Sequence, residues 1–152
     1  MIVWTGAEAQ TGGSATGEFR ARTWPLVRRT RHMEIHITAG EDGAATVIAA
    51  QGELDVLTAA SLRTAISDVI DGGRAHLVLD ASGISFLDST GIGVLVIALR
   101  RTRAFDGSFA IAGARGGALR TLELTGLTRV FTLYDTVAEA EAAIAPLVGE
   151  PS

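Results

Sequence analysis

Three polar residues, Asp88-Ser89-Thr90, interrupt an apolar stretch of this sequence and place a carboxylate next to two hydroxyl groups. Serine and a carboxylate suggest hydrolysis if a histidine completes a triad. A nucleophile elbow requires Gly-x-Ser-x-Gly, however, and Leu87 stands two positions before Ser89. The histidines, none of which neighbours the serine in sequence, are His32, His36 and His76. No His or carboxylate pair has helical ligand spacing near a third ligand, so we expect neither a catalytic residue nor a metal site.

Two glycines, Gly91 and Gly93, follow the serine with the spacing that begins a dinucleotide-binding fingerprint. The third glycine of that fingerprint is missing, because position 96 is valine. We therefore expect no nucleotide cofactor. Each glycine costs roughly 1 kcal/mol in a helix relative to alanine, so we expect the pair to allow close packing or the approach of a partner's backbone.

A buried strand and a helix are predicted on either side of the polar residues. The run His76–Asp80 is typical of a strand buried on both faces, and Gly91–Arg103 is predicted to be helical. Asp88, Ser89 and Thr90 are all N-cap residue types, so the serine should stand at a helix start. The helix has no polar side for two turns, which predicts burial inside a domain, and it is too short to span a membrane. From spacing alone, Ser89 is equally well read as a simple N-cap and as a modification site.

Strands and helices alternate along the rest of the chain, which predicts an α/β layer architecture. Thr58 is predicted to cap the first helix, and Thr136 with Glu139 forms a capping-box pattern before the last one. Further elements are expected at 34–37, 45–50, 59–71, 109–113, 118–125, 130–133 and 137–147.

Charge is distributed unevenly over the 152 residues. Residues 1–32 have a formal charge of +3, whereas eight arginines and 15 carboxylates give the remainder −7. An acidic domain is not expected to bind nucleic acid, and its natural partner is a protein. The chain has no cysteine, which excludes disulfides and is compatible with a cytoplasmic location. We expect residues 1–32 to be a disordered extension and 149–152 to be a tail, with Met33 as an alternative translation start.

Three segments in the same order resemble the anti-sigma factor antagonists, small bacterial proteins of the STAS domain class. The central one is Phe86–Gly93, in which Ile92 replaces the usual leucine. The others are Gly52–Asp55 followed by Thr58-Ala59, and Leu122–Phe131. The resemblance covers roughly residues 33–148. It implies one STAS-like α/β domain, with a mixed sheet of four to five strands packed with about four helices.

The same resemblance implies a function based on binding. In this class a partner kinase, which is also the anti-sigma factor, phosphorylates the serine that corresponds to Ser89. The unmodified protein binds that kinase and releases the sigma factor, and a phosphatase restores the serine. The implied partner-binding residues are Glu53, Asp55, Asp88, Ser89, Thr90, Gly91 and Gly93, while Asp80 either joins this surface or caps a turn. The alternative is a STAS subunit of another assembly, such as a stress-sensing scaffold or a lipid transport complex; a nucleotide-binding protein is less favoured.

Overall fold

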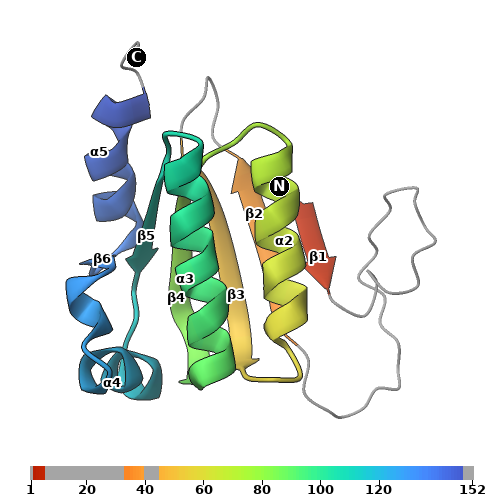
Figure 1. The fold of residues 1–152 in the computed structure, drawn as a ribbon, viewed down its shortest axis with the longest axis vertical. Coiled ribbons are helices and arrows are strands. Elements are labelled where there is room, and N and C mark those ends of the chain that lie inside the picture. The colour runs from red at the N-terminus through yellow and green to blue at the C-terminus, as the bar shows by residue number, and fades with distance from the viewer. Residues whose placement is uncertain (1, 6–32, 40–44, 149–152) are drawn as a thin grey trace.

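The structure, a computed structural model, describes residues 2–5, 33–39 and 45–148 of the chain. Its strands are β1 Ile2–Thr5, β2 Glu34–Ala39, β3 Thr46–Leu54, β4 His76–Leu87, β5 Ser108–Ala112 and β6 Thr132–Tyr134. They form one sheet in the order β1-β2-β3-β4-β5-β6 (Figure 1). The β1–β2 and β2–β3 pairs are antiparallel, and the pairs from β3 to β6 are parallel. The carboxyl ends of β3 and β4 therefore lie at the same edge of the sheet.

Helices cover both faces of this sheet. They are α2 Ala59–Asp71, α3 Ser89–Ala104, α4 Gly116–Leu124 and α5 Val137–Val148, with a 3-10 turn η2 at Leu127–Arg129. Side chains of β4 alternate between the faces, so that Leu77 and Leu79 meet α2 and α3, while Val78 meets α5. Figure 1 shows α2 and α3 side by side in front of the sheet, with β3 visible between them. The α/β alternation predicted from the sequence is confirmed.

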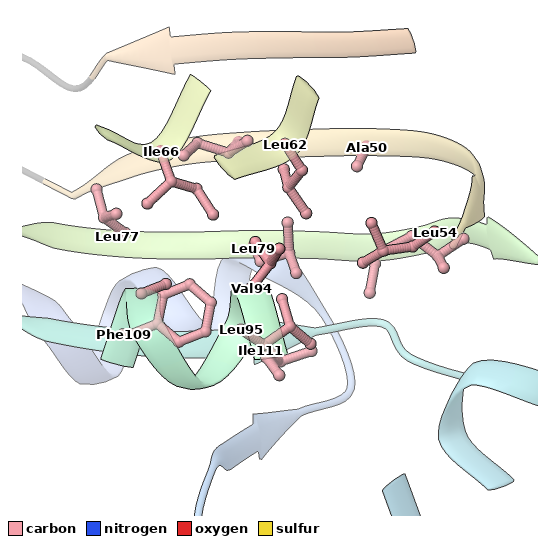
Figure 2. Packing of buried hydrophobic residues seen from close by; sticks show 14 of the residues in the cluster. Ala50, Leu54, Leu62, Ile66, Leu77, Leu79, Val94, Leu95, Phe109 and Ile111 are labelled. Atoms are coloured by element: carbon pink, nitrogen blue, oxygen red, sulfur yellow. The ribbon is translucent and has the colours of Figure 1, made fainter. Parts of the chain in front are cut away.

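The larger core lies between the sheet and the helices α2 and α3. Figure 2 shows its aliphatic side chains together with Phe109 of β5, which lies towards one end of the group. Phe109 also makes an edge-to-face contact with Phe131, with ring centroids 6.1 Å apart. Other members of this core are Ala50, Leu54, Leu62, Ile66, Leu77, Leu79, Val94, Leu95 and Ile111. This packing fixes the starts of α2 and α3 relative to the sheet.

The helix α3 is less deeply buried than its sequence predicts. Val94, Leu95 and Ala98 are buried on its inner face, but Ile97 is exposed. The helix therefore has a buried face and an exposed face although its sequence is apolar on both. The prediction that α3 is buried on all sides was wrong. The exposed side of α3 continues from Ser89 along the surface.

The central strand is longer than predicted. Asp80 pairs with Ala112 at the end of β5, and beyond that point β4 continues to Leu87 beside β3. The Asp80 carboxylate accepts hydrogen bonds from Ser82, at 3.1 Å from its N–H and 2.7 Å from its hydroxyl. Asp80 therefore shapes the middle of a strand, and the prediction that the strand ends there was wrong.

The N-terminal extension was predicted to be disordered over residues 1–32, and this was wrong for β1. Residues 2–5 pair in register with β2, from Ile2 opposite Ile37 to Thr5 opposite Glu34. Residues 6–32 and the tail at 149–152 lie outside the described residues. The sheet consequently has one strand beyond the four or five expected.

Candidate functional site

The serine singled out by the sequence begins α3, as predicted. Asp88 is the N-cap of this helix, and its Oδ1 accepts hydrogen bonds from the N–H groups of Thr90 at 2.9 Å and Gly91 at 3.0 Å. Ser89 is therefore the first helical residue, and the cap is supplied by its neighbour. Ser89 is exposed, and among the described residues no partner lies within hydrogen-bonding distance of its hydroxyl. We call residues 87–91 the α3 corner.

The adjacent helix start, residues 53–58, is built differently, and we call it the α2 corner. The Asp55 carboxylate is buried and accepts hydrogen bonds from the N–H groups of Leu57 at 2.9 Å and Thr58 at 3.2 Å. The Thr58 hydroxyl donates to the carbonyl of Glu53 at 2.6 Å and accepts from the Asp55 N–H at 3.0 Å. Thr58 was predicted to cap α2 with its side chain, and this was wrong because the hydroxyl turns back towards the strand.

The two corners are in direct contact. The Asp88 N–H donates to the carbonyl of Leu54 at 3.2 Å, and Leu54 pairs with Leu87 in the β3–β4 register. At Gly91, an added Cβ would lie 2.6 Å from Leu54 Cγ, 2.8 Å from Leu87 Cδ1 and 2.9 Å from the Leu54 carbonyl oxygen. The backbone approach that this glycine permits is therefore to its own chain.

The predicted partner-binding residues thus separate into two groups. Asp55 and Gly91 are buried: the Asp55 carboxylate holds the turn of the α2 corner, and Gly91 packs the α3 corner against Leu54. The residues available at the surface are Glu53, Ser89 and Thr90, with Asp88 and Gly93 half-buried. An added Cβ at Gly93 meets nothing within 4 Å, so this glycine has open space beside it. The structure brings all seven residues to one edge of the sheet.

Exposed apolar side chains were missed by the sequence reasoning. Val56 and Leu57, in the α2 corner, are 67% and 69% exposed, and Phe86 at the end of β4 is exposed as well. A signal was present, because Val56 and Leu57 stand between a strand end and a helix start, where no buried element needs them. Large exposed apolar side chains at one place on a surface are typical of interaction sites.

The histidines lie elsewhere. His36 is in β2, where its Nε2 is 3.8 Å from a Glu34 carboxylate oxygen. His76 begins β4, at the amino end of the strand, and its Nδ1 is 2.9 Å from the Ser108 hydroxyl oxygen. His32 lies outside the described residues. Within the described ranges, no group of three His, Asp or Glu side chains could hold a metal ion.

The opposite end of α2 carries a separate polar contact. Arg101 of α3 donates to a carboxylate oxygen of Asp71 at 3.0 Å and to the Ser67 hydroxyl at 3.0 Å. Burial and the neighbouring Asp71 raise the pKa of the Asp68 carboxyl. The contacts of Arg101 join α2 and α3 away from the corners.

Over the described part of the chain, every helix is too short or too polar to cross a membrane.

Comparison with known proteins identifies the family. The model of the STAS domain matches residues 36–140. The chain belongs to the STAS domain family. The anti-sigma-F factor antagonist RsfB of Mycobacterium tuberculosis is 29% identical over 106 residues, covering 70% of this chain and 86% of the relative. The anti-sigma F factor antagonist of Paenibacillus polymyxa is 25% identical over 109 residues, covering 71% of this chain and 93% of the relative.

Solved structures agree with this STAS assignment. A crystal structure of an anti-sigma factor antagonist from Mycobacterium paratuberculosis is 32% identical, with a TM-score of 0.64, covering 74% of this chain and 94% of that one. The unphosphorylated form of the anti-sigma factor antagonist SpoIIAA has a TM-score of 0.61 at 23% identity, covering 78% of this chain and 99% of that one, and supports the fold. The resemblance inferred from the three sequence segments is confirmed.

Proposed function

We propose that this STAS protein is an anti-sigma factor antagonist controlled by phosphorylation of Ser89. Unmodified, it binds an anti-sigma factor that is also a serine kinase, and the sigma factor is released. The observation that carries the proposal is an exposed serine hydroxyl, free of hydrogen bonds within the described chain, at a helix start whose cap is already filled by Asp88. The names of the curated relatives support the partner class.

The hydroxyl is suited to modification because the fold does not use it. Thr58, at the neighbouring helix start, is buried and hydrogen bonded, so a kinase would have to open the α2 corner to reach it. Ser89, in contrast, is an exposed residue. Phosphorylation there requires no rearrangement of the core.

The added phosphate changes the surface more than the fold. It brings about −1.5 to −2 charges, which the N-terminus of α3 favours by up to roughly 2 kcal/mol. The Asp88 carboxylate opposes it, because unit charges about 6 Å apart repel by roughly 3 kcal/mol at an effective dielectric of about 20. Asp88 also occupies the N–H groups of Thr90 and Gly91, so the phosphate stays hydrated at the surface. The two effects oppose each other and leave a net change of only a few kcal/mol, less than the roughly 5 to 15 kcal/mol by which a domain is usually stable, so the fold survives.

A partner that covers Ser89 experiences the change differently. Its surface would have to accommodate a bulky, hydrated dianion beside Asp88 and Glu53. A loss of about 3 kcal/mol in binding weakens the complex more than a hundredfold. The kinase supplies the ATP site, and a phosphatase removes the phosphate. This chain therefore acts by binding and needs no cofactor. We place its action in the cytoplasm.

The test is phosphorylation by candidate anti-sigma kinases of the same genome, followed by intact mass spectrometry and peptide mapping. We expect a single added phosphate on Ser89 that is absent in Ser89→Ala and retained in the control Thr90→Ala. Phosphate on Thr90 or Ser85, or equal binding of the modified and unmodified proteins, would contradict the proposal.

The variant Ser89→Asp examines the switch without the kinase reaction. One carboxylate beside Asp88 should leave the melting temperature nearly unchanged, because the helix N-terminus favours negative charge. It should weaken binding to the anti-sigma factor, although less than phosphate does, since it carries one charge. Titration calorimetry against Ser89→Ala, which should bind like wild type, measures the difference.

A further inference from the structure

Two aliphatic side chains project from the α2 corner into solvent. Val56 and Leu57 occupy the turn between β3 and α2, and both are more than half exposed. They contribute nothing to the buried core, which is completed by Leu54 before them and Ala59 after them. Neither the fold nor the phosphorylation of Ser89 accounts for their exposure.

The turn that carries them is rigidly held. Its backbone is fixed by the Asp55 carboxylate, which binds the N–H groups of Leu57 and Thr58. The Asp55 carbonyl accepts from the N–H groups of Thr58 at 3.1 Å and Ala59 at 2.8 Å. The buried Thr58 hydroxyl ties the same turn to the end of β3. An apolar pair on such a turn loses little conformational entropy on binding, which favours a strong contact.

This apolar pair is continuous with the surface around Ser89. Val56 is two residues from Leu54, whose carbonyl accepts the Asp88 N–H, and Ser89 follows Asp88 directly. Parallel β3 and β4 deliver both turns to one edge of the sheet, side by side at the starts of α2 and α3 (Figure 1). A protein that covers Ser89 therefore reaches Val56 and Leu57 as well.

We propose that Val56 and Leu57 determine which anti-sigma factor binds, by entering an apolar recess on the protein that contacts Ser89. This inference rests on the proposed function and adds the basis of partner choice to it. Phosphate on Ser89 decides whether the complex forms, while the fit of two aliphatic side chains decides with which partner. Glu53 in the α2 corner and Asp88 in the adjoining α3 corner give this edge of the sheet negative charge, so the recess should have basic groups at its rim.

The experiment compares the wild-type chain with the double variant V56S/L57S in calorimetric titrations against each anti-sigma factor of the same genome. The matched control is Phe105→Ser, because Phe105 is 59% exposed at the opposite end of α3. The conservative variant Leu57→Met keeps an apolar side chain of similar volume. All three should melt like wild type, since the altered side chains are exposed.

We expect the double variant to bind the preferred anti-sigma factor at least roughly tenfold more weakly, the effect of removing a well-packed apolar anchor. Phe105→Ser should stay within about twofold, and Leu57→Met within about threefold, of wild type. Binding of the double variant within twofold of wild type, or an equal loss in Phe105→Ser, would overturn the inference.

The same titrations, combined with phosphorylation assays, distinguish a failure of the proposed function from a failure of this inference. If an anti-sigma factor binds but leaves Ser89 unphosphorylated, the switch is wrong, while the dissociation constants still decide the role of Val56 and Leu57. If no anti-sigma factor of the genome binds the wild-type chain, the proposed function and this inference are both overturned.

Discussion

The two helix starts at the carboxyl edge of the sheet use the same residue types in opposite ways. In the α2 corner, Thr58 is 2% exposed and Asp55 7% exposed, and their hydrogen bonds join the end of β3 to the start of α2. In the α3 corner, Asp88 fills the cap alone and leaves the neighbouring Ser89 hydroxyl in solvent. A hydroxyl at a helix start is therefore available for signalling where a neighbouring carboxylate already caps the helix.

Backbone torsions explain why the corners differ. Asp88 is extended, with φ −112° and ψ −172°, which is the geometry that lets an N-cap side chain reach forward to the first turn. Thr58 has φ −107° and ψ −11°, close to the helical region, and its hydroxyl points back to the Glu53 carbonyl. The α2 corner therefore uses its hydroxyl to stabilise the fold, and the α3 corner carries a hydroxyl that can be modified.

The largest effect is expected where the corners meet. In Gly91→Val the new side chain would overlap Leu54 and Leu87, so we expect a loss of about 2 to 3 kcal/mol in unfolding free energy. Gly93→Ala is the matched control, because it meets no atom within 4 Å and should gain up to about 1 kcal/mol from helix propensity. Chemical denaturation measures both. A Gly91→Val protein as stable as wild type would show that the corners are not closely packed.

The next largest effect on stability is expected at the Thr58 hydroxyl of the α2 corner. Thr58→Val keeps the shape of the side chain but leaves the Asp55 N–H and the Glu53 carbonyl without their hydroxyl partner, so about 1 to 2 kcal/mol should be lost. Thr58→Ser retains the hydroxyl and should lose less. The comparison between the corners fails if Thr58→Val unfolds at the same denaturant concentration as wild type.

Much of this arrangement was predictable from the sequence. The α/β alternation, the helix start at Ser89 and the cap for α5 all follow from local residue patterns, and the Thr136 hydroxyl does accept the Glu139 N–H at 3.1 Å. Sequence alone does not predict whether the Thr58 hydroxyl caps the first turn of α2 or bonds back to the Glu53 carbonyl. That depends on the backbone torsions of Thr58, and threonine is compatible with either arrangement. Sequence likewise indicates that Gly91 permits close approach, but only packing identifies Leu54 as the group that approaches.

The strand β1 was not predicted from the sequence because it pairs with a strand far along the chain. β1 pairs with β2 across the intervening residues 6–32, and a four-residue strand has too little periodicity to be recognised alone. The position of Val56 and Leu57 between a strand end and a helix start was a signal for exposure, but only the packing shows that both side chains stay outside the core.

A smaller effect is expected from the cap of α3. Asp88→Ala removes the acceptor for the N–H groups of Thr90 and Gly91, which should cost about 1 kcal/mol. Asp88→Asn is the control, because asparagine is an equally good N-cap residue. Thermal unfolding distinguishes the two variants, and equal losses would mean that the charge of Asp88 matters and its capping hydrogen bonds do not.

The smallest effect on stability is expected at the residue proposed to matter most for function. From its residue type, Ser89 could itself have capped the helix, and Ser89→Ala would then lose about 1 kcal/mol. Because Asp88 provides the cap and the serine is exposed, we instead expect a change within about 0.5 kcal/mol. Denaturation of Ser89→Ala beside Thr58→Val tests this directly, with kinase labelling of the same samples. A stable Ser89→Ala protein that no longer accepts phosphate would separate signalling from folding at this corner, whereas a loss as large as that in Thr58→Val would show that both hydroxyls serve the fold.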